Sequence, residues 1–145
     1  MNAYADSSFI TALYLKQTTS ERAIGLSASL PLPLPFTPLH RLEVRNSFRL
    51  AVFRKEITSE QAKAALRQLE TNLEHNEGIT HCSLKWTDAL RQAEDLGAQF
   101  TELLGTRAYD LLHVATAREF NAEIFLTFDP RQAKLANAAG LLVRS

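Results

Sequence analysis

Short apolar segments alternate with longer amphipathic segments along the whole chain, and this alternation constrains the fold more than any other feature. The apolar segments have the length and composition of buried strands and lie at residues 1–5, 34–37, 79–82, 124–128 and 141–143. Helices are expected between them, including one over residues 83–104 with a break at Gly97. Strands that alternate with helices are typical of a mostly parallel sheet. We therefore expect an α/β protein in three layers.

The size and composition of the chain fit one globular domain spanning residues 1–145. Hydrophobic residues make up 46% of the chain, as in ordinary globular proteins. Sixteen basic residues balance sixteen acidic ones, so the charge carries no signature of nucleic-acid binding. The single cysteine, Cys82, excludes an intramolecular disulfide. Because neither a targeting segment nor an apolar run of membrane-spanning length is visible, a cytoplasmic protein is expected.

The first candidate catalytic residue is Asp6, which directly follows the first strand-like segment. Ser7 or Ser8 can cap the helix that comes next. In open α/β sheets, ligands bind at the carboxyl ends of the strands, which is where Asp6 is expected. Taken alone, Asp6 has an equally good explanation as a residue that shares the helix cap with Ser7.

The most unusual composition lies at residues 30–38, where apolar residues alternate with prolines. A polyproline-like surface linker is one interpretation. We favour a short strand over Leu34–Thr37, because Pro31, Pro33 and Pro35 share one parity and their missing N–H groups would face one side. Residues of the other parity could still pair with a neighbouring strand.

A second candidate, Glu43, lies on the helix expected from Leu39 to about Lys55 after the capping pair Thr37-Pro38. At about 100° per residue, one face of this helix collects Leu39, Glu43, Asn46, Leu50 and Phe53, and the opposite face collects Arg41, Arg45 and Arg49. An unpaired carboxylate in an apolar stripe is costly. The alternative is that Glu43 snorkels at the edge of the stripe.

Two further acids lie near helix starts in the last third of the chain. Residues 107–120 are the most apolar stretch and indicate a buried helix with Asp110 in its first turns. The helix dipole favours an anion there by only about 0.3–1 kcal/mol, so an ion pair with Arg107 is the structural alternative. Asp129 follows the strand at 124–128 and precedes Pro130, and a helix cap alone would explain it.

Asp6, Glu43, Asp110 and Asp129 could all converge at one end of the sheet. Crowded carboxylates raise one another's pKa by repulsion, and a bound divalent cation removes that repulsion. Hard oxygen ligands without a His/Cys set indicate Mg²⁺ or Mn²⁺ rather than zinc. The histidines show no zinc-ligand spacing, and Cys82 is more typical of a small buried hydrophobe than of a nucleophile.

The chain resembles PIN-domain proteins, and specifically the small VapC-type ribonuclease toxins of bacterial toxin–antitoxin pairs. The resemblance covers essentially the whole chain and rests on four motifs in order: Asp6-Ser7-Ser8, Glu43 in Leu-Glu-Val-Arg-Asn, Asp110 in Tyr-Asp-Leu-Leu-His-Val-Ala-Thr-Ala, and Thr127-Phe128-Asp129. Each motif is weak alone, and their order makes the signal specific. The resemblance implies a PIN-like, Rossmann-like parallel sheet of about five strands, in agreement with the alternation above.

By this resemblance, the four acids coordinate one or two Mg²⁺ or Mn²⁺ ions that activate water for attack on a phosphodiester bond of RNA. Ser7 and Thr127 would orient carboxylates or waters. Lys16, Arg107, Arg131 and Lys134 are the candidates for contacts with RNA phosphates. The arginine stripe at 41, 45 and 49 is expected to be a solvated face instead.

The resemblance also implies a cognate antitoxin protein and a two-fold homodimer. The early helices carry more apolar surface than such a sheet can cover, and the surplus residues are Leu13, Leu15, Leu26, Leu30, Phe48 and Val52. An exposed patch of this kind indicates an interface. In VapC-type toxins this region receives the antitoxin, whose arginine can reach the acidic cleft.

Two other classes remain open. A HAD-type phosphatase or a receiver domain also has an Asp after its first strand, but the former needs Asp-x-Asp where this chain has Asp6-Ser-Ser8. The latter needs paired early acids and a late lysine, and neither is evident. A catalytically inactive PIN module that only binds RNA or protein is the other alternative, which the presence of all four acids disfavours.

Overall fold

The computed structural model of the protein describes residues 2–145. These residues contain seven helices and five strands, and they form two compact units. The split unit combines the chain up to Asp6 with Leu84–Ser145, and the continuous unit comprises Ser7–Ser83. Every strand pairing within the described residues is parallel, as the alternation of strands and helices predicts. That 1–145 behaves as one domain stays a prediction.

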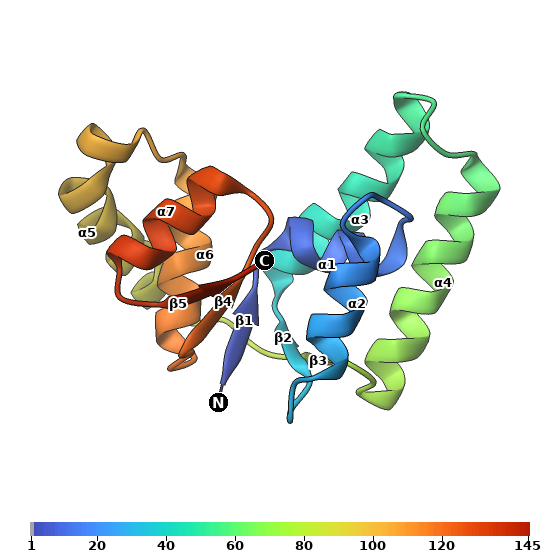
Figure 1. The fold of residues 1–145 in the computed structure, drawn as a ribbon, viewed down its shortest axis with the longest axis horizontal. Helices are drawn as coiled ribbons and strands as arrows, with labels where there is room; N and C mark the ends of the chain where they lie inside the picture. The colour runs from blue at the N-terminus through green and yellow to red at the C-terminus, as the bar shows by residue number, and fades with distance from the viewer. Residues whose placement is uncertain (1) are drawn as a thin grey trace. The chain divides into compact units, whose positions relative to one another are not determined.

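The split unit is built on a three-stranded parallel sheet in the order β1-β4-β5, visible in Figure 1. Its strands are β1 (Ala3–Ala5), β4 (Ile124–Leu126) and β5 (Leu142–Arg144), and its helices are α5 (Trp86–Leu104), α6 (Ala108–Glu119) and α7 (Pro130–Ala138). Helix α6 packs against β1 and α5, and α7 packs against β5. The central strand β4 is buried at all three positions, which explains why residues 124–126 are continuously apolar.

Aromatic packing and one buried hydrogen bond connect β1 to its neighbours. Tyr4 is fully buried and lies 5.7 Å from Phe125 and 6.4 Å from Phe120 between ring centroids. Its hydroxyl is 2.8 Å from Nδ1 of His113 on α6. A buried tyrosine hydroxyl needs such a partner, because an unpaired one costs about 1–3 kcal/mol. This pairing gives His113 a structural role within the core.

Helix α5 runs without interruption from Trp86 to Leu104, so the predicted break at Gly97 is wrong. A Cβ atom at Gly97 would lie 3.2 Å from Cδ1 of Leu111 on α6. The glycine therefore permits a close approach of the two helices, and this packing compensates for its weak helix propensity. The helix ends where expected, at Gly105, whose φ of 65° is left-handed.

The continuous unit contains four helices and a two-stranded parallel sheet. Its elements are α1 (Ser7–Tyr14), α2 (Ser20–Ala28), β2 (Leu34–Phe36), α3 (Pro38–Phe53), α4 (Ser59–His75) and β3 (Ile79–His81). Helix α1 begins at Ser7, so both serines considered as its cap lie inside the helix. Helix α3 packs against α1 and α4.

The proline-rich segment forms the strand that its parity predicts. Leu34 donates its N–H to the carbonyl of Gly78 at 2.8 Å, and the carbonyl of Phe36 accepts from Cys82 at 3.0 Å. Pro35 lies between these two paired residues and opposite Thr80, where its missing N–H is not required by β3. The surface-linker alternative is therefore excluded for residues 34–36.

Helix α3 buries a different face from the predicted one. Its buried residues are Leu39, His40, Val44, Phe48 and Ala51. Phe53 is 81% exposed and Leu50 is 37% exposed, although both were expected inside. The sequence offers two apolar faces on this helix, and packing against α1 and α4 selects the one with Val44 and Phe48. The predicted surplus surface changes accordingly, because Phe48 and Leu15 are core residues.

The length and apolar character of the described helices can be compared with what a membrane-spanning helix requires. None of the helices in residues 2–145 combines the length and apolar character that crossing a bilayer requires.

Candidate active site

The carboxyl ends of two neighbouring strands in the split unit carry a buried hydrogen-bonded pair. Asp6 follows β1, and Thr127 follows the parallel strand β4. Thr127 Oγ1 donates to Asp6 Oδ2 at 2.5 Å, although the two residues are 121 positions apart in the chain. Asp6 is 6% exposed and Thr127 is fully buried. The sheet therefore brings together an acid and a hydroxyl that the sequence assigned to the same site.

The hydroxyl of Thr127 also connects to the third residue of its motif. It accepts the N–H of Asp129 at 3.0 Å. Asp129 is the N-cap of α7, and its Oδ1 accepts the N–H of Arg131 at 2.9 Å. The helix-cap alternative is thus present in the structure. The backbone N–H of Asp129 and the carboxylate of Asp6 share the hydroxyl of Thr127, so the cap residue and Asp6 are connected through one side chain.

Asp110 lies in the first turn of α6 with only 9% of its surface exposed. Its Oδ2 accepts the N–H of Arg107 at 3.2 Å and lies 3.5 Å from Arg107 Nε. The ion pair considered from the sequence is therefore present. Arg107 Nη2 is also 3.9 Å from Asp129 Oδ2, so one guanidinium contacts two of the predicted acids.

Gln132 on α7 is part of this region, although no motif in the sequence singles it out as a site residue. Its side chain is 1% exposed, and Nε2 donates to the backbone carbonyl of Asp110 at 3.2 Å. It connects the helix capped by Asp129 to the helix that carries Asp110. Among the described residues, its Oε1 is the buried side-chain oxygen or nitrogen that lacks a hydrogen-bond partner. Only its position three residues after a capping Asp was visible in the sequence, and that spacing predicts a capping box.

Glu43 and Ser7 contact each other in the continuous unit. Ser7 Oγ donates to Glu43 Oε1 at 2.9 Å, and Ser7 is 6% exposed. The start of α3, which positions Glu43, is fixed by a capping box in which His40 Nδ1 accepts the N–H of Thr37 at 3.0 Å. A set of Asp6, Glu43, Asp110 and Asp129 involves both units and stays a prediction.

The candidate phosphate-binding residues are all exposed, as such residues must be. Arg131 and Lys134 lie on α7, Arg107 precedes α6, and Lys16 follows α1 in the continuous unit. The arginine stripe of α3 is not simply solvated, because Glu70 Oε1 on α4 binds Arg41 at 3.1 Å and Arg45 at 2.6 Å.

The chemistry of these donors fits a hard divalent cation. Asp6, Asp110 and Asp129 offer carboxylate oxygens, and Thr127 offers a hydroxyl, which are the donors that Mg²⁺ and Mn²⁺ prefer. Within the part of the chain that the structure describes, no three His, Cys, Asp or Glu side chains form a ready group of metal ligands. The donor types therefore fit a metal, and the ligand set itself stays a prediction.

Two side chains with a raised pKa, Tyr14 and Cys82, lie outside this region, and both belong to the continuous unit. Burial raises the pKa of the Cys82 thiol, and the backbone hydrogen bond from Phe36 lowers it by less. Burial likewise raises the pKa of the Tyr14 hydroxyl, against the smaller effect of its hydrogen bond with Asn72. A raised thiol pKa agrees with the view that Cys82 is no activated nucleophile.

Comparison with known proteins gives the family. The sequence profile of the PIN domain matches residues 3–138, so the chain belongs to the PIN-domain family. No curated protein sequence is significantly similar to the chain. The resemblance to PIN-domain proteins is thus confirmed, and with it the predicted PIN-like parallel α/β fold.

Solved structures with the same fold include toxins and their complexes. VapC20 of Mycobacterium tuberculosis, a toxin that cleaves the sarcin–ricin loop, has a TM-score of 0.67 at 20% identity and covers 97% of both chains. FitAcB of Neisseria gonorrhoeae has a TM-score of 0.64 at 16% identity, covering 99% of this chain and 96% of its own. VapBC2 of Rickettsia felis, bound to a promoter DNA fragment, has a TM-score of 0.66 at 14% identity, with 99% and 98% covered. The fold is therefore that of VapC-type toxins.

Proposed function

We propose that the protein is a metal-dependent endoribonuclease and the toxin of a toxin–antitoxin pair. Membership of the PIN-domain family supports a nuclease of this type at the level of the family. The observation that carries the proposal within this chain is the hydroxyl of Thr127, which contacts both Asp6 and Asp129. If Asp129 served only to cap α7, the buried carboxylate of Asp6 at the end of the neighbouring strand β1 would have no part in that role.

In the proposed reaction, Asp6, Glu43, Asp110 and Asp129 hold Mg²⁺ or Mn²⁺. The bound ion would supply an activated water and stabilise the negative charge that develops on the scissile phosphate. Thr127 fixes the orientation of the Asp6 carboxylate through its hydrogen bond. Ser7 does the same for Glu43 in the continuous unit. Burial of Asp6 limits the access of water that would otherwise weaken electrostatic interactions.

RNA is the proposed substrate, and the exposed cations near the acids of the split unit are the proposed phosphate contacts. Arg131 and Lys134 lie on the helix that Asp129 caps, so both are within two turns of one proposed ligand. Lys16 is the corresponding candidate in the continuous unit. Because phosphate contacts release counterions, RNA affinity should fall as the salt concentration rises.

An antitoxin and a second copy of the chain are the proposed protein partners. Two of the similar structures are toxin–antitoxin or related two-protein complexes by name, VapBC2 and FitAcB. The continuous unit offers a hollow of about 500 Å³ lined mainly by apolar residues of α1, α2 and the proline-rich segment, with the polar Gln68, Asn72 and Glu77 also in its lining. Ile24 and Leu32 at its rim are 54% and 62% exposed. We propose that an apolar segment of the antitoxin binds there, against a hollow that includes Leu13 and Leu30 of the surplus surface predicted from the sequence.

The test of catalysis is cleavage of a labelled RNA in Mg²⁺ or Mn²⁺ by the wild type and by Asp6→Asn. Asp95→Asn is a matched control, since Asp95 is an exposed acid on α5 of the same split unit. Asp6→Asn should abolish cleavage while circular dichroism shows an intact fold, and Asp95→Asn should cleave normally.

Cleavage that persists in Asp6→Asn, or that disappears only because the variant unfolds, would contradict the catalytic role of Asp6. A folded wild type that binds RNA without cleaving it in either metal would instead favour the inactive PIN module. Light scattering and binding of a co-encoded small protein test the proposed partners separately.

A further inference from the structure

Arg107 is a basic side chain that contacts two of the proposed ligands, Asp110 and Asp129. Its Nε lies 3.5 Å from Asp110 Oδ2, and its Nη2 lies 3.9 Å from Asp129 Oδ2. Both contacts are internal to the split unit. Of the two acids, Asp110 is mostly buried with a side-chain exposure of 12%, and Asp129 is partly exposed at 35%. One guanidinium of the chain therefore already lies against two of the carboxylates that would hold the metal.

The backbone of Arg107 is fixed, but its side chain is not tightly held. Its N–H donates to Asp110 Oδ2 at 3.2 Å, and its carbonyl accepts the N–H of Leu111 at 3.1 Å. The side chain, in contrast, is 66% exposed. Its contacts of 3.5 and 3.9 Å are longer than the roughly 2.7–2.9 Å of a strong bidentate pair. An exposed, long-range pair of this kind is weak and can be displaced.

We propose that Arg107 is an internal counter-cation that competes with the divalent metal for Asp110 and Asp129. In the metal-free protein it reduces the repulsion between the two carboxylates. The guanidinium of Arg107 would be displaced when a divalent metal binds, because a divalent ion interacts more strongly with the carboxylates than one exposed positive charge does. The metal affinity of this site is therefore set in part by a residue that is not a ligand. This inference rests on the proposed function, which supplies the metal.

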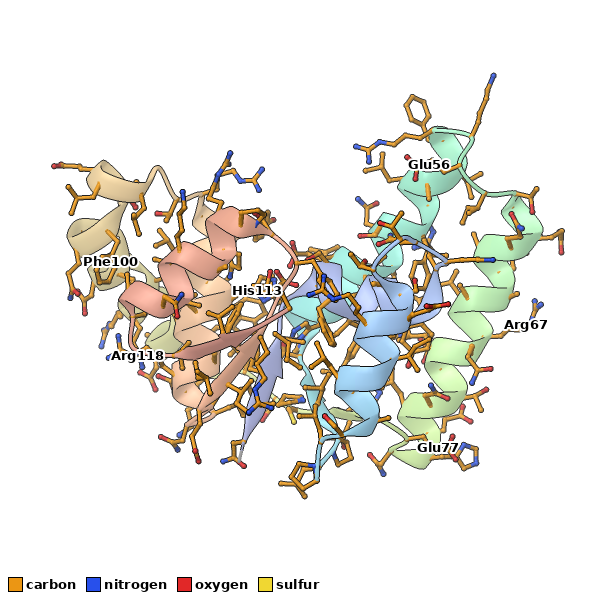
Figure 2. All side chains as sticks on the ribbon, viewed as in Figure 1. Glu56, Arg67, Glu77, Phe100, His113 and Arg118 are labelled. Carbon is orange, nitrogen blue, oxygen red and sulfur yellow. The ribbon has the colours of Figure 1, made fainter. Side chains whose placement is uncertain are left out.

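The test is calorimetric titration of Mn²⁺ into the metal-free full chain. Arg107→Gln should bind Mn²⁺ about three- to tenfold more tightly than the wild type, the range expected when weak exposed ion pairs no longer compete. Arg107→Lys, which keeps the charge, should stay within about twofold of the wild type. Arg118→Gln is the matched control, because this substitution makes the same change in net charge. Arg118 lies in the last turn of α6, at the opposite end of the helix from Asp110 (Figure 2).

A second readout distinguishes competition from a merely structural role. The increase in melting temperature on adding Mn²⁺ should be larger for Arg107→Gln than for the wild type, since tighter binding stabilises more by mass action. A variant that had only lost structural contacts would bind Mn²⁺ equally or more weakly.

Unchanged or weaker Mn²⁺ binding by Arg107→Gln would overturn the inference and leave the proposed nuclease intact. An equal gain in Arg107→Gln and Arg118→Gln would also overturn it, because the effect would then be one of net charge. If the wild type and all three variants bind no Mn²⁺, the metal in the proposed function fails, and this inference fails with it.

Discussion

The hydroxyl of Thr127 provides the sharpest test of how the site is held together. Replacing Thr127 by valine keeps the shape of the side chain and removes one donor to Asp6 and one acceptor from Asp129. A hydrogen bond to a charged group contributes about 1.5–3 kcal/mol, and leaving a buried polar group without its partner costs about 1–3 kcal/mol. The lost hydrogen bond and the unpaired polar group both result from removing one oxygen atom, so their costs are not additive. We therefore expect Thr127→Val to lower the free energy of unfolding by about 2–4 kcal/mol.

Thr116→Val is the matched control for this experiment. Thr116 is also fully buried in the split unit, but its hydroxyl donates only to the helix carbonyl of Leu112, at 2.7 Å. Losing a neutral hydrogen bond of this kind should cost about 0.5–1.5 kcal/mol. The assay is urea unfolding followed by the fluorescence of Trp86, the only tryptophan, which lies in the same unit.

The charge of Asp6 can be isolated by a double-mutant cycle. In the Asp6→Asn background the acceptor is neutral, so Thr127→Val should cost about 1 kcal/mol less than in the wild type. If Thr127→Val costs no more than Thr116→Val, or if its cost is the same in both backgrounds, the reasoning about a charge-assisted bond at the strand ends is refuted.

Three further predictions concern other features. Gly97→Leu should destabilise the protein by about 1–3 kcal/mol or more in thermal melts, because its side chain would overlap Leu111 across the α5–α6 contact; a stability equal to that of the wild type would contradict the close approach of the helices. Gly105→Ala should cost about 1–2 kcal/mol in urea unfolding, because φ of 65° is strained for alanine; a neutral effect would show that the left-handed cap is dispensable. The raised pKa of Cys82 predicts that its reaction with a thiol reagent at pH 8 is slower than that of free cysteine and gains rate toward higher pH; a rate equal to that of free cysteine would exclude the effect of burial.

The succession of strands and helices was predictable because their boundaries are set by local chemistry. Thr37-Pro38 and Asp129-Pro130 are pairs of a type favoured at helix starts, and each starts a helix here. Gly105 ends a helix because glycine adopts its left-handed backbone conformation without strain. The same local logic placed β2 among prolines of a single parity. These features depend on neighbours in the sequence and need no knowledge of tertiary packing.

Features decided by packing were not predictable from one sequence. Helix α3 has apolar residues on two faces, and only its contacts with α1 and α4 choose Phe48 over Phe53 for the core. The break expected at Gly97 is absent because a neighbouring helix, invisible to local propensity, stabilises the continuous helix there.

In the candidate site, too, some residues were predictable from the sequence, whereas others depend on tertiary packing. The rule on strand ends placed Asp6 at the edge of the sheet, and the resemblance to PIN-domain proteins gave Thr127 the role of orienting a carboxylate. The hydrogen bond between the two residues agrees with both expectations. Gln132 was missed because its spacing from Asp129 predicts a capping box, whereas its side chain turns inward to the carbonyl of Asp110. That direction depends on how α7 packs on α6.

The order of segments in the split unit has a consequence for how the protein is made. Asp6 leaves the ribosome 121 positions before its hydroxyl partner Thr127. At about 5–20 residues per second, synthesis delays their meeting by roughly 6 to 24 seconds. Strand β1 has no partner in the split unit's sheet until β4 has emerged, because β4 is its only neighbour among the described strands. A nascent chain thus cannot complete this acidic site before Thr127 has emerged, and any nuclease activity that needs the site would begin only after that point.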